Sequence, residues 1–212
     1  MESARSVSIA LEQASPAVNQ ESAFVAELQA GSEEAFAYLL TVYQNPVFNL
    51  VCHVVENQAD ASDVLQDVFV KVFRGIKGFK GDSSLRTWIY RIAVHEASNL
   101  RRSWIRRHWR EPVSMDDTES PSAAVATEAA SSERSPYQVF EQAERELVVK
   151  RALASLAPPY RTVVVLREIE GLAYEEIAQV LGVAEGTVKS RLLRGRELLR
   201  RKLAGYVGKD HV

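Results

Sequence analysis

Hydrophobic residues recur every three or four positions through most of the chain, the spacing that places them on one face of a helix. Between residues 22 and 109 the pattern predicts four helices, which begin near Ser22, Ser32, Ala59 and Ser84. Pro46 falls inside the second helix and should bend or divide it, because proline lacks the N–H of the helical hydrogen bond. No stretch shows a convincing strand pattern. The first half is therefore predicted to be a helical bundle, in which Ser32 caps the second helix and the buried faces include Leu40, Phe69 and Phe73.

Helical spacing resumes in the second half of the chain. One helix there should end before Pro158 and Pro159, which start the next, and Ile169 on that next helix should face the core. The segment from Gly171 to Leu203 then predicts two short helices, at about 174–181 and from 184 or 185 onward, around a left-handed corner at Gly182. The second keeps an apolar stripe made of Val188, Leu192, Gly195, Leu199 and Leu203. Two amphipathic helices joined in this way are typical of a helix-turn-helix.

Composition changes between the two helical halves. Residues 111–136 contain three prolines in a stretch rich in Ser, Ala and acids, which favours disorder. Its acids either imitate nucleic acid or merely keep the segment soluble. Residues 1–20 and 206–212 are predicted to be flexible tails. The sequence therefore predicts an all-α protein, with two small helical domains at 21–110 and 137–205 joined by a flexible linker.

The overall composition is that of an ordinary globular protein. The 212 residues carry a net charge of −2 and one cysteine, Cys52, which is expected to be a buried, inert thiol. No apolar run has the length of a membrane span, and the N-terminus lacks the apolar core of a signal peptide. The expectation is a cytoplasmic protein without membrane insertion. The four histidines and the glycines match no metal, triad or phosphate-loop spacing, so neither an enzyme nor a cofactor or metal is expected.

Charge is segregated between the third and fourth predicted helices. The solvent face of the third carries an acidic cluster of Asp60, Asp63, Gln66 and Asp67. The fourth interleaves arginines with Trp88, Tyr90, Trp104 and Trp109, a mixture that suits nucleic acid with unstacked bases. Each feature also has a simpler interpretation, in which the acids are only solvated and Trp88 is a core residue.

The outer face of the last helix is polar and cationic. Thr187, Ser190 and Arg194 point away from the apolar stripe, and Lys189 and Arg191 flank them. Short polar side chains of this kind reach base edges in the major groove, while cations reach phosphates. The alternative is an ordinary solvated helix, but the cationic face coincides with the helical corner and favours DNA binding.

Two stretches together carry a family resemblance. The stretch from Asp60 to His95, DASDVLQDVFVKVFRGIKGFKGDSSLRTWIYRIAVH, resembles region 2 of bacterial sigma factors, and that from Leu156 to Leu199 looks like their region 4. With these two regions in this order and only a short linker, the chain resembles an extracytoplasmic-function (ECF) sigma factor. The resemblance implies a transcription initiation factor that binds core RNA polymerase, melts the −10 element and recognises the −35 element.

The resemblance also implies partners and contact residues. The partners are core RNA polymerase, through its β′ clamp and β flap, double- and single-stranded promoter DNA, and in some cases an anti-sigma factor. The polymerase contacts would be Asp60, Asp63, Gln66 and Asp67. The −10 contacts would be Phe79, Lys80, Ser83, Ser84, Arg86, Thr87, Trp88, Arg91 and His95. The −35 contacts would be Glu185, Gly186, Thr187, Lys189, Ser190, Arg191 and Arg194.

The chain departs from the family pattern at three positions. His95 stands where Asn is usual, and Glu96 where an apolar residue is usual, which leaves the −10 preference open. By helical geometry Glu96 points toward the apolar stripe, so it must pair with a cation or lie at the rim of the domain. Ala184 replaces the usual Ser at the start of the recognition helix and removes a cap.

Two rival functions fit parts of the sequence. In one, the chain is a stand-alone regulator that uses the same helix-turn-helix, with 22–110 as a sensing or dimerising domain. In the other, Asp60, Asp63 and Asp67 hold the metal of a helical nuclease, although they lie close together on one helix without a partner cluster. Co-purification with core polymerase and a metal-dependent nuclease assay would separate these from a sigma factor.

Overall fold

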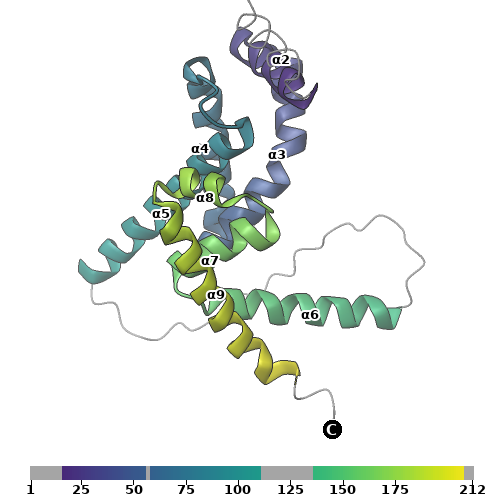
Figure 1. The fold of residues 1–212 in the computed structure, drawn as a ribbon, viewed down its shortest axis with the longest axis vertical. Coiled ribbons are helices and arrows are strands. Elements are labelled where there is room, and N and C mark those ends of the chain that lie inside the picture. Colours follow the sequence, from purple (N-terminus) through teal and green to yellow (C-terminus); the bar gives the residue numbers. More distant parts are fainter. Residues whose placement is uncertain (1–15, 56–57, 111–135, 208–212) are drawn as a thin grey trace, which may run out of the picture.

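The computed structural model describes residues 16–55, 58–110 and 136–207. Every regular element in these ranges is helical (Figure 1). In the first half of the chain they are α2 (Pro16–Ala30), α3 (Glu33–Val54), α4 (Gln58–Gly75), the short 3-10 helix η1 (Ile76–Gly78) and α5 (Leu85–Arg110). In the second half they are α6 (Pro136–Ala154), α7 (Pro158–Val164), the π-helical turn η2 (Val165–Ile169), α8 (Tyr174–Leu181) and α9 (Glu185–Val207).

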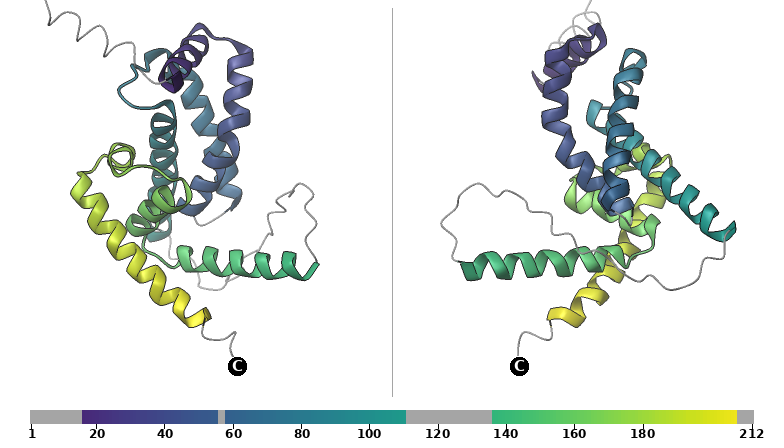
Figure 2. Two further views of the ribbon diagram at one scale, coloured as in Figure 1. Left: turned by 45° about the vertical axis from the view of Figure 1, so that its right-hand side comes forward. Right: turned by 180° about the vertical axis from the view of Figure 1, so that it is seen from behind.

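The first unit is a bundle in which α3, α4 and α5 pack against one another and α2 lies across one end (Figure 2). The Oγ of Ser32 accepts a 3.2 Å bond from the N–H of Ala35, and Glu33 and Glu34 occupy the first turn of α3. The predicted cap is therefore confirmed, because the side chain satisfies an N–H that has no partner within the helix. The buried apolar faces of the three helices include Leu39, Leu50, Val64, Val68, Ile89 and Ala93.

The first unit differs from the sequence prediction at its first helix, and it removes one of the two effects predicted for Pro46. Helix α2 begins at Pro16, inside the predicted flexible tail 1–20, because a proline fits the first turn of a helix and the residues after it continue one. Pro46 does not divide α3, which runs unbroken to Val54. Val47 and Leu50, which follow the proline, are buried and hold the second part of the helix against the core.

Two large apolar side chains in the bundle were predicted to be buried and are not. Leu40 on α3 is exposed, and Phe73 on α4 is 60% exposed. The ring of Phe73 lies 4.8 Å from that of Phe36, centroid to centroid. These residues line an open groove between α3 and α4. Helical spacing therefore showed correctly which face is apolar, but it did not show that this face stays uncovered.

The second unit contains the predicted helix-turn-helix. The two helices have the predicted bounds, and Gly182 between them has a left-handed backbone with φ of 63°. Gly195 on α9 is buried against α7, where a Cβ would lie 2.7 Å from Cγ2 of Val164. Pro158 and Pro159 start α7 as predicted. The sequence thus predicted the bounds of α8 and the starts of α7 and α9 accurately, because glycine and proline mark these positions.

The turn η2 was not predicted. Here the N–H of Glu170 donates to the carbonyl of Val165, a span of five residues. Ile169 was expected in the core, but the wider turn carries it to the surface. The same turn leaves Glu170 buried. A π-turn is rare and often marks a functional position.

The two helical units pack against each other. Helix α5 lies on α8, and α3 contacts α7 (Figure 2). Buried side chains of both units belong to one continuous apolar cluster. The prediction of an all-α chain with two helical units is confirmed, and the structure adds that they cover part of each other. The linker prediction for 111–136 falls outside the described residues except for Pro136, which starts α6.

Candidate polymerase and promoter interfaces

An acidic face and an apolar groove lie side by side on the first unit. Val64, Val68 and Val72 anchor α4 in the core, which turns Asp63, Gln66 and Asp67 outward. All three are exposed, and Asp60 is partly exposed. The adjoining groove between α3 and α4 has a volume of about 620 Å³, and Gln66 is part of its lining. The apolar lining consists mainly of Phe36, Leu39, Leu40, Leu65, Phe69, Val70 and Phe73.

The structure therefore brings together the residues predicted to bind polymerase, and it adds an apolar surface that sequence analysis missed. Exposed phenylalanine next to acidic side chains is unusual for a surface that faces only water. The signal in the sequence was the i, i+4 spacing of Phe69 and Phe73, which places the two rings one turn apart on α4. That spacing was interpreted as core.

The loop before α5 and the first turns of α5 hold most of the predicted −10 residues. The hydroxyl of Ser84 accepts a 3.1 Å bond from the N–H of Thr87 and donates to the Thr87 hydroxyl at 2.8 Å. Ser84 therefore caps the first turn of α5, a structural role in addition to the predicted one. Lys80 is exposed in the loop, and Ser83 is half-buried.

Phe79 and Trp88 form one aromatic cluster. Their ring centroids are 5.2 Å apart, and both rings are half-buried. The ring of Trp88 also lies 3.3 Å from the position that a Cβ on Gly75 would take. The core interpretation of Trp88 is thus partly correct, because one face is packed while some of the ring stays accessible.

The other predicted −10 residues differ in their accessibility. Arg91 and His95 are exposed, whereas Thr87 is 1% exposed and Arg86 is half-buried. Thr87 and Arg86 are covered by the second unit, which contacts them through Glu170 and Glu176. The sequence pattern of α5 gave no sign of this cover, because threonine and arginine are normally surface residues.

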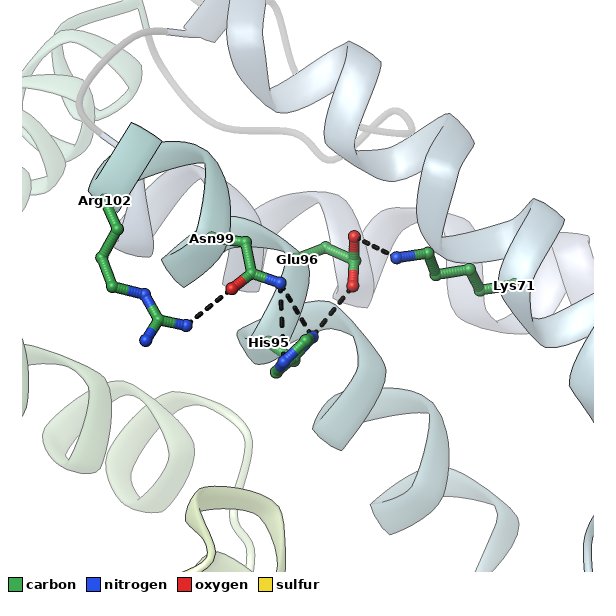
Figure 3. Close-up of polar contacts among 5 residues, drawn as sticks. All are labelled: Lys71, His95, Glu96, Asn99 and Arg102. Atoms are coloured by element: carbon green, nitrogen blue, oxygen red, sulfur yellow. Dashed lines mark hydrogen bonds and ion pairs between the residues drawn. The ribbon is translucent and has the colours of Figure 1, made fainter. Parts of the chain in front are cut away.

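His95 and Glu96 belong to a polar network that joins α4 to α5 (Figure 3). Glu96 forms an ion pair with Lys71 at 2.5 Å and a hydrogen bond with His95 Nδ1 at 3.0 Å. Burial alone would raise the pKa of Glu96, but the hydrogen bonds from Lys71 and His95 outweigh it and hold the pKa below its usual value. Of the two arrangements predicted for Glu96, the structure therefore shows the pairing with a cation.

The network extends along the exposed face of α5 to residues that sequence analysis did not select. The amide of Asn99 lies 3.0 Å from Nδ1 of His95, and its carbonyl oxygen accepts a 2.6 Å bond from Arg102 (Figure 3). These side chains follow His95 at intervals of one turn, which is the signal that could have found them. Together they continue the polar face of α5 beyond the predicted −10 residues.

The outer face of α9 is polar as predicted. Ser190 and Arg194 are exposed, and Thr187 and Arg191 are partly exposed. Glu185 forms a 2.5 Å ion pair with Lys189, one turn along. Gly186 is exposed with open space around its Cα. The hydroxyl of Ser190 donates to the carbonyl of Thr187. Leu193, which is 73% exposed on the same helix, was not predicted.

Three further properties concern the part of the chain that the structure describes. No three His, Cys, Asp or Glu side chains in it converge as metal ligands would. None of its helices combines the length and apolarity that crossing a membrane requires. Cys52, predicted to be buried, is half-buried, and burial raises the pKa of its thiol.

Comparisons with known proteins match both units. The family description "Sigma-70 region 2" matches residues 39–111, and "Sigma-70, region 4" matches residues 146–199. An all-α chain with these two regions in this order, an acidic face on the first unit and a cationic face on the helix-turn-helix has the organisation of a bacterial sigma factor.

Curated relatives of nearly equal length show which family of sigma factors the chain resembles. The ECF RNA polymerase sigma-E factor of Haemophilus influenzae is 36% identical over 85% of this chain and 94% of its own length. The RNA polymerase sigma-H factor of Pseudomonas aeruginosa is 35% identical over 87% of this chain and 94% of its own. The chain belongs to the ECF family of RNA polymerase sigma factors. It binds core RNA polymerase and directs promoter-specific initiation of transcription.

Two solved structures share the fold. CnrH, in complex with the cytosolic domain of CnrY, matches 87% of this chain and 97% of its own length with a TM-score of 0.62 and 23% identity. RpoE of Bartonella quintana, in complex with the anti-sigma factor NepR, matches 80% and 96% with a TM-score of 0.64 and 24% identity. At these identities the likeness concerns the fold.

Proposed function

We propose that the acidic face of α4 and the groove beside it bind the β′ clamp of core RNA polymerase. The acidic face consists of Asp60, Asp63, Gln66 and Asp67, to which the family resemblance assigns this contact. The observation that carries this proposal is that exposed carboxylates lie directly beside an exposed apolar groove. Gln66 lies between Asp63 and Asp67 in the sequence of α4 and also lines the groove. The groove supplies apolar area for a partner, and the carboxylates supply register and specificity. The second unit would meet the β flap.

Promoter recognition would be divided between the two cationic helices, α5 and α9. The loop and first turns of α5, from Phe79 to His95, would capture the melted −10 strand by stacking and by cationic contacts. The outer face of α9 would enter the major groove at the −35 element, with Glu185, Thr187 and Ser190 near base edges and Lys189, Arg191 and Arg194 near phosphates.

Three further parts of the proposal concern context. The factor would act in the cytoplasm, without enzymatic activity of its own, in a stress or envelope response. An anti-sigma factor would regulate it, which is supported by the anti-sigma complex of the RpoE that shares its fold. These parts rest on family membership rather than on any single side chain.

Reversal of charge on α4 tests the polymerase interface. Asp63→Lys with Asp67→Lys should weaken the affinity of the full chain for core polymerase at least about tenfold, which corresponds to about 1.4 kcal/mol, because attractive pairs become repulsive. Asp82→Lys with Glu144→Lys makes the same change of net charge at two other exposed acids. Fluorescence titration with tagged core polymerase measures both. Equal affinity of the two double variants would remove this face from the interface.

A further inference from the structure

The exposed imidazole of His95 lies against an enclosed carboxylate (Figure 3). The side chain of His95 is 65% exposed, whereas that of Glu96 is 13% exposed. Oε1 of Glu96 lies 3.0 Å from Nδ1 of His95, and its other oxygen, Oε2, pairs with Lys71 at 2.5 Å. Each oxygen of the carboxylate therefore has a partner of its own, one on α5 and one on α4.

This contact decides which ring nitrogen of His95 carries the proton when the ring is neutral. A neutral imidazole has one N–H donor and one acceptor nitrogen. The pKa of Glu96 is held below its usual value, so its carboxylate is ionised near neutral pH and can only accept. A proton on Nδ1 gives it a charge-assisted bond, whereas an unprotonated Nδ1 would set two lone pairs against each other. Glu96 therefore selects Nδ1–H and leaves Nε2 as an acceptor.

Asn99 and Arg102 steady the ring without opposing this choice. Arg102 can only donate, so the oxygen of the Asn99 amide must face it, at 2.6 Å. The amide nitrogen of Asn99 is thereby turned toward the ring, 3.0 Å from Nδ1 and 3.5 Å from Nε2. It can donate to whichever nitrogen is unprotonated. Its contact with Nε2 is long and therefore weak, so the NH group of a base can replace it.

His95 lies where an acceptor could distinguish bases. It is exposed, and it follows Trp88 by seven residues and Arg91 by four, which are about two turns and one turn of helix. Adenine and cytosine carry an amino group, N6 or N4, at the place where guanine and thymine carry a carbonyl oxygen. An acceptor nitrogen attracts the amino group and repels the oxygen.

We propose that Glu96 is a positioning residue for promoter recognition, which fixes His95 as an acceptor and so favours adenine or cytosine at one position of the −10 element. The proposal rests on the proposed −10 role of α5. The right base gains a hydrogen bond, and the wrong one leaves two acceptors facing each other. The expected preference for adenine or cytosine over guanine or thymine is about tenfold.

Glu96→Gln tests this with almost no change of shape. Lys71 can only donate, so the oxygen of the new amide must face Lys71 and its NH2 group must face His95. Nδ1 then becomes the acceptor and Nε2 carries the proton, so His95 should favour guanine or thymine instead. Glu144→Gln removes the same charge at an exposed acid of α6 and should keep the natural preference.

Base preference and ring proton are measured separately. Transcription from a library with a randomised −10 element gives the preference, with holoenzyme at about pH 8, above the ordinary titration range of histidine. Proton–nitrogen NMR of the full free chain distinguishes protonated from unprotonated ring nitrogens, and His95→Ala identifies the signals of His95. Glu96→Gln should exchange the two nitrogen signals and invert the preference. Glu96→Met gives Nδ1 no carboxylate or amide in place of Glu96, so the preference should be lost.

The outcomes separate the parts of the proposal. A proton on Nε2 in the natural chain, or ring signals that stay the same in Glu96→Gln and Glu96→Met, would overturn the role of Glu96. Inversion by Glu144→Gln as well would assign the effect to net charge. Exchanged signals with an unchanged base preference would show that His95 reads no base. In that case permanganate footprinting of Trp88→Ala decides whether the −10 role of α5 itself fails, which it does if melting is also unchanged.

Discussion

Lys71 on α4 and Glu96 on α5 form a 2.5 Å ion pair in which only the acid is enclosed: the Lys71 side chain is 51% exposed and that of Glu96 is 13% exposed. The two partners therefore depend on the pair to different degrees. Without Glu96, the lysine can return to water. Without Lys71, the carboxylate keeps only its 3.0 Å contact with Nδ1 of His95.

Substitution of the two partners should consequently have unequal effects on stability. Lys71→Met should lower the free energy of unfolding by about 1 kcal/mol, because a largely enclosed carboxylate loses its main partner. Glu96→Met should change it little, since an apolar residue suits this position and the lysine is solvated. Urea denaturation at pH 7 measures both, with Lys77→Met as a surface control. Equal losses would show that the pair contributes as a unit.

The same ion pair predicts a pH dependence. The pKa of Glu96 is lowered in the folded protein, so the carboxylate contributes stability above its ordinary pKa of 4.5, and this is lost as the pH falls through the folded value. The deficit of Lys71→Met relative to the natural chain should therefore shrink below pH 4.5. A deficit that stays constant down to about pH 3 would mean that packing of the lysine stem, rather than charge, is lost.

His53 should make stability fall at mildly acid pH. Burial lowers the pKa of this histidine in the folded protein, although a 2.6 Å contact with the carbonyl of Asn49 acts in the opposite direction. Below the ordinary value of 6.5 the unfolded chain binds the proton more readily, so acid favours unfolding. His53→Gln should flatten the loss of stability between about pH 7 and pH 5. Denaturant titrations at several pH values measure this. If the free energy of unfolding of His53→Gln falls with pH as steeply as that of the natural chain, other groups cause the loss.

Close packing at Gly195 should not tolerate a methyl group. A Cβ there would lie 2.7 Å from Val164 and 3.3 Å from the carbonyl of Tyr160. Gly195→Ala should therefore cost about 1–3 kcal/mol of unfolding free energy, and Val164→Ala should recover part of it in the double variant. Gly186→Ala, which has open space, serves as the control. If thermal unfolding shows Gly195→Ala to be neutral, α7 and α9 are not in close contact in solution.

Recognition of the −35 element should divide along α9. Arg194→Ala should weaken binding to all promoters by a similar factor and reduce the salt slope by about one unit, as loss of one phosphate contact does. Glu185→Ala should instead change which bases are tolerated, since a carboxylate accepts from cytosine. It should also release Lys189 from its 2.5 Å ion pair. Transcription from a randomised −35 library at two salt concentrations separates the two effects. A base-specific effect of Arg194→Ala would reverse this assignment.

The sequence was most informative where local chemistry decides structure. The corner at Gly182 and the prolines at the start of α7 marked the second unit accurately, because left-handed backbone and a missing N–H each restrict where a residue can lie. Glu96 was also placed correctly, because a charge on an apolar face requires a partner.

The sequence was least informative about which surfaces meet. Helical spacing marks an apolar face but not its cover, so Phe73 was assigned to the core although its groove is open. Thr87 shows the reverse error, because a polar residue expected at the DNA surface is buried by a helix whose Glu176 lies 89 residues away in the chain. Contacts between distant segments depend on the docking of whole units, which no local pattern encodes.

The π-helical turn at Val165–Ile169 also has an evolutionary consequence. Its extra residue per turn sets the direction in which Glu170 leaves the helix. An α-helix advances by about 100° per residue, so loss of one residue from this turn would rotate the carboxylate away from α5. Insertions and deletions of a single codon in this turn are therefore the shortest mutational route by which a lineage could gain or lose the contact between the two units, without altering the sequence of α5 or α9.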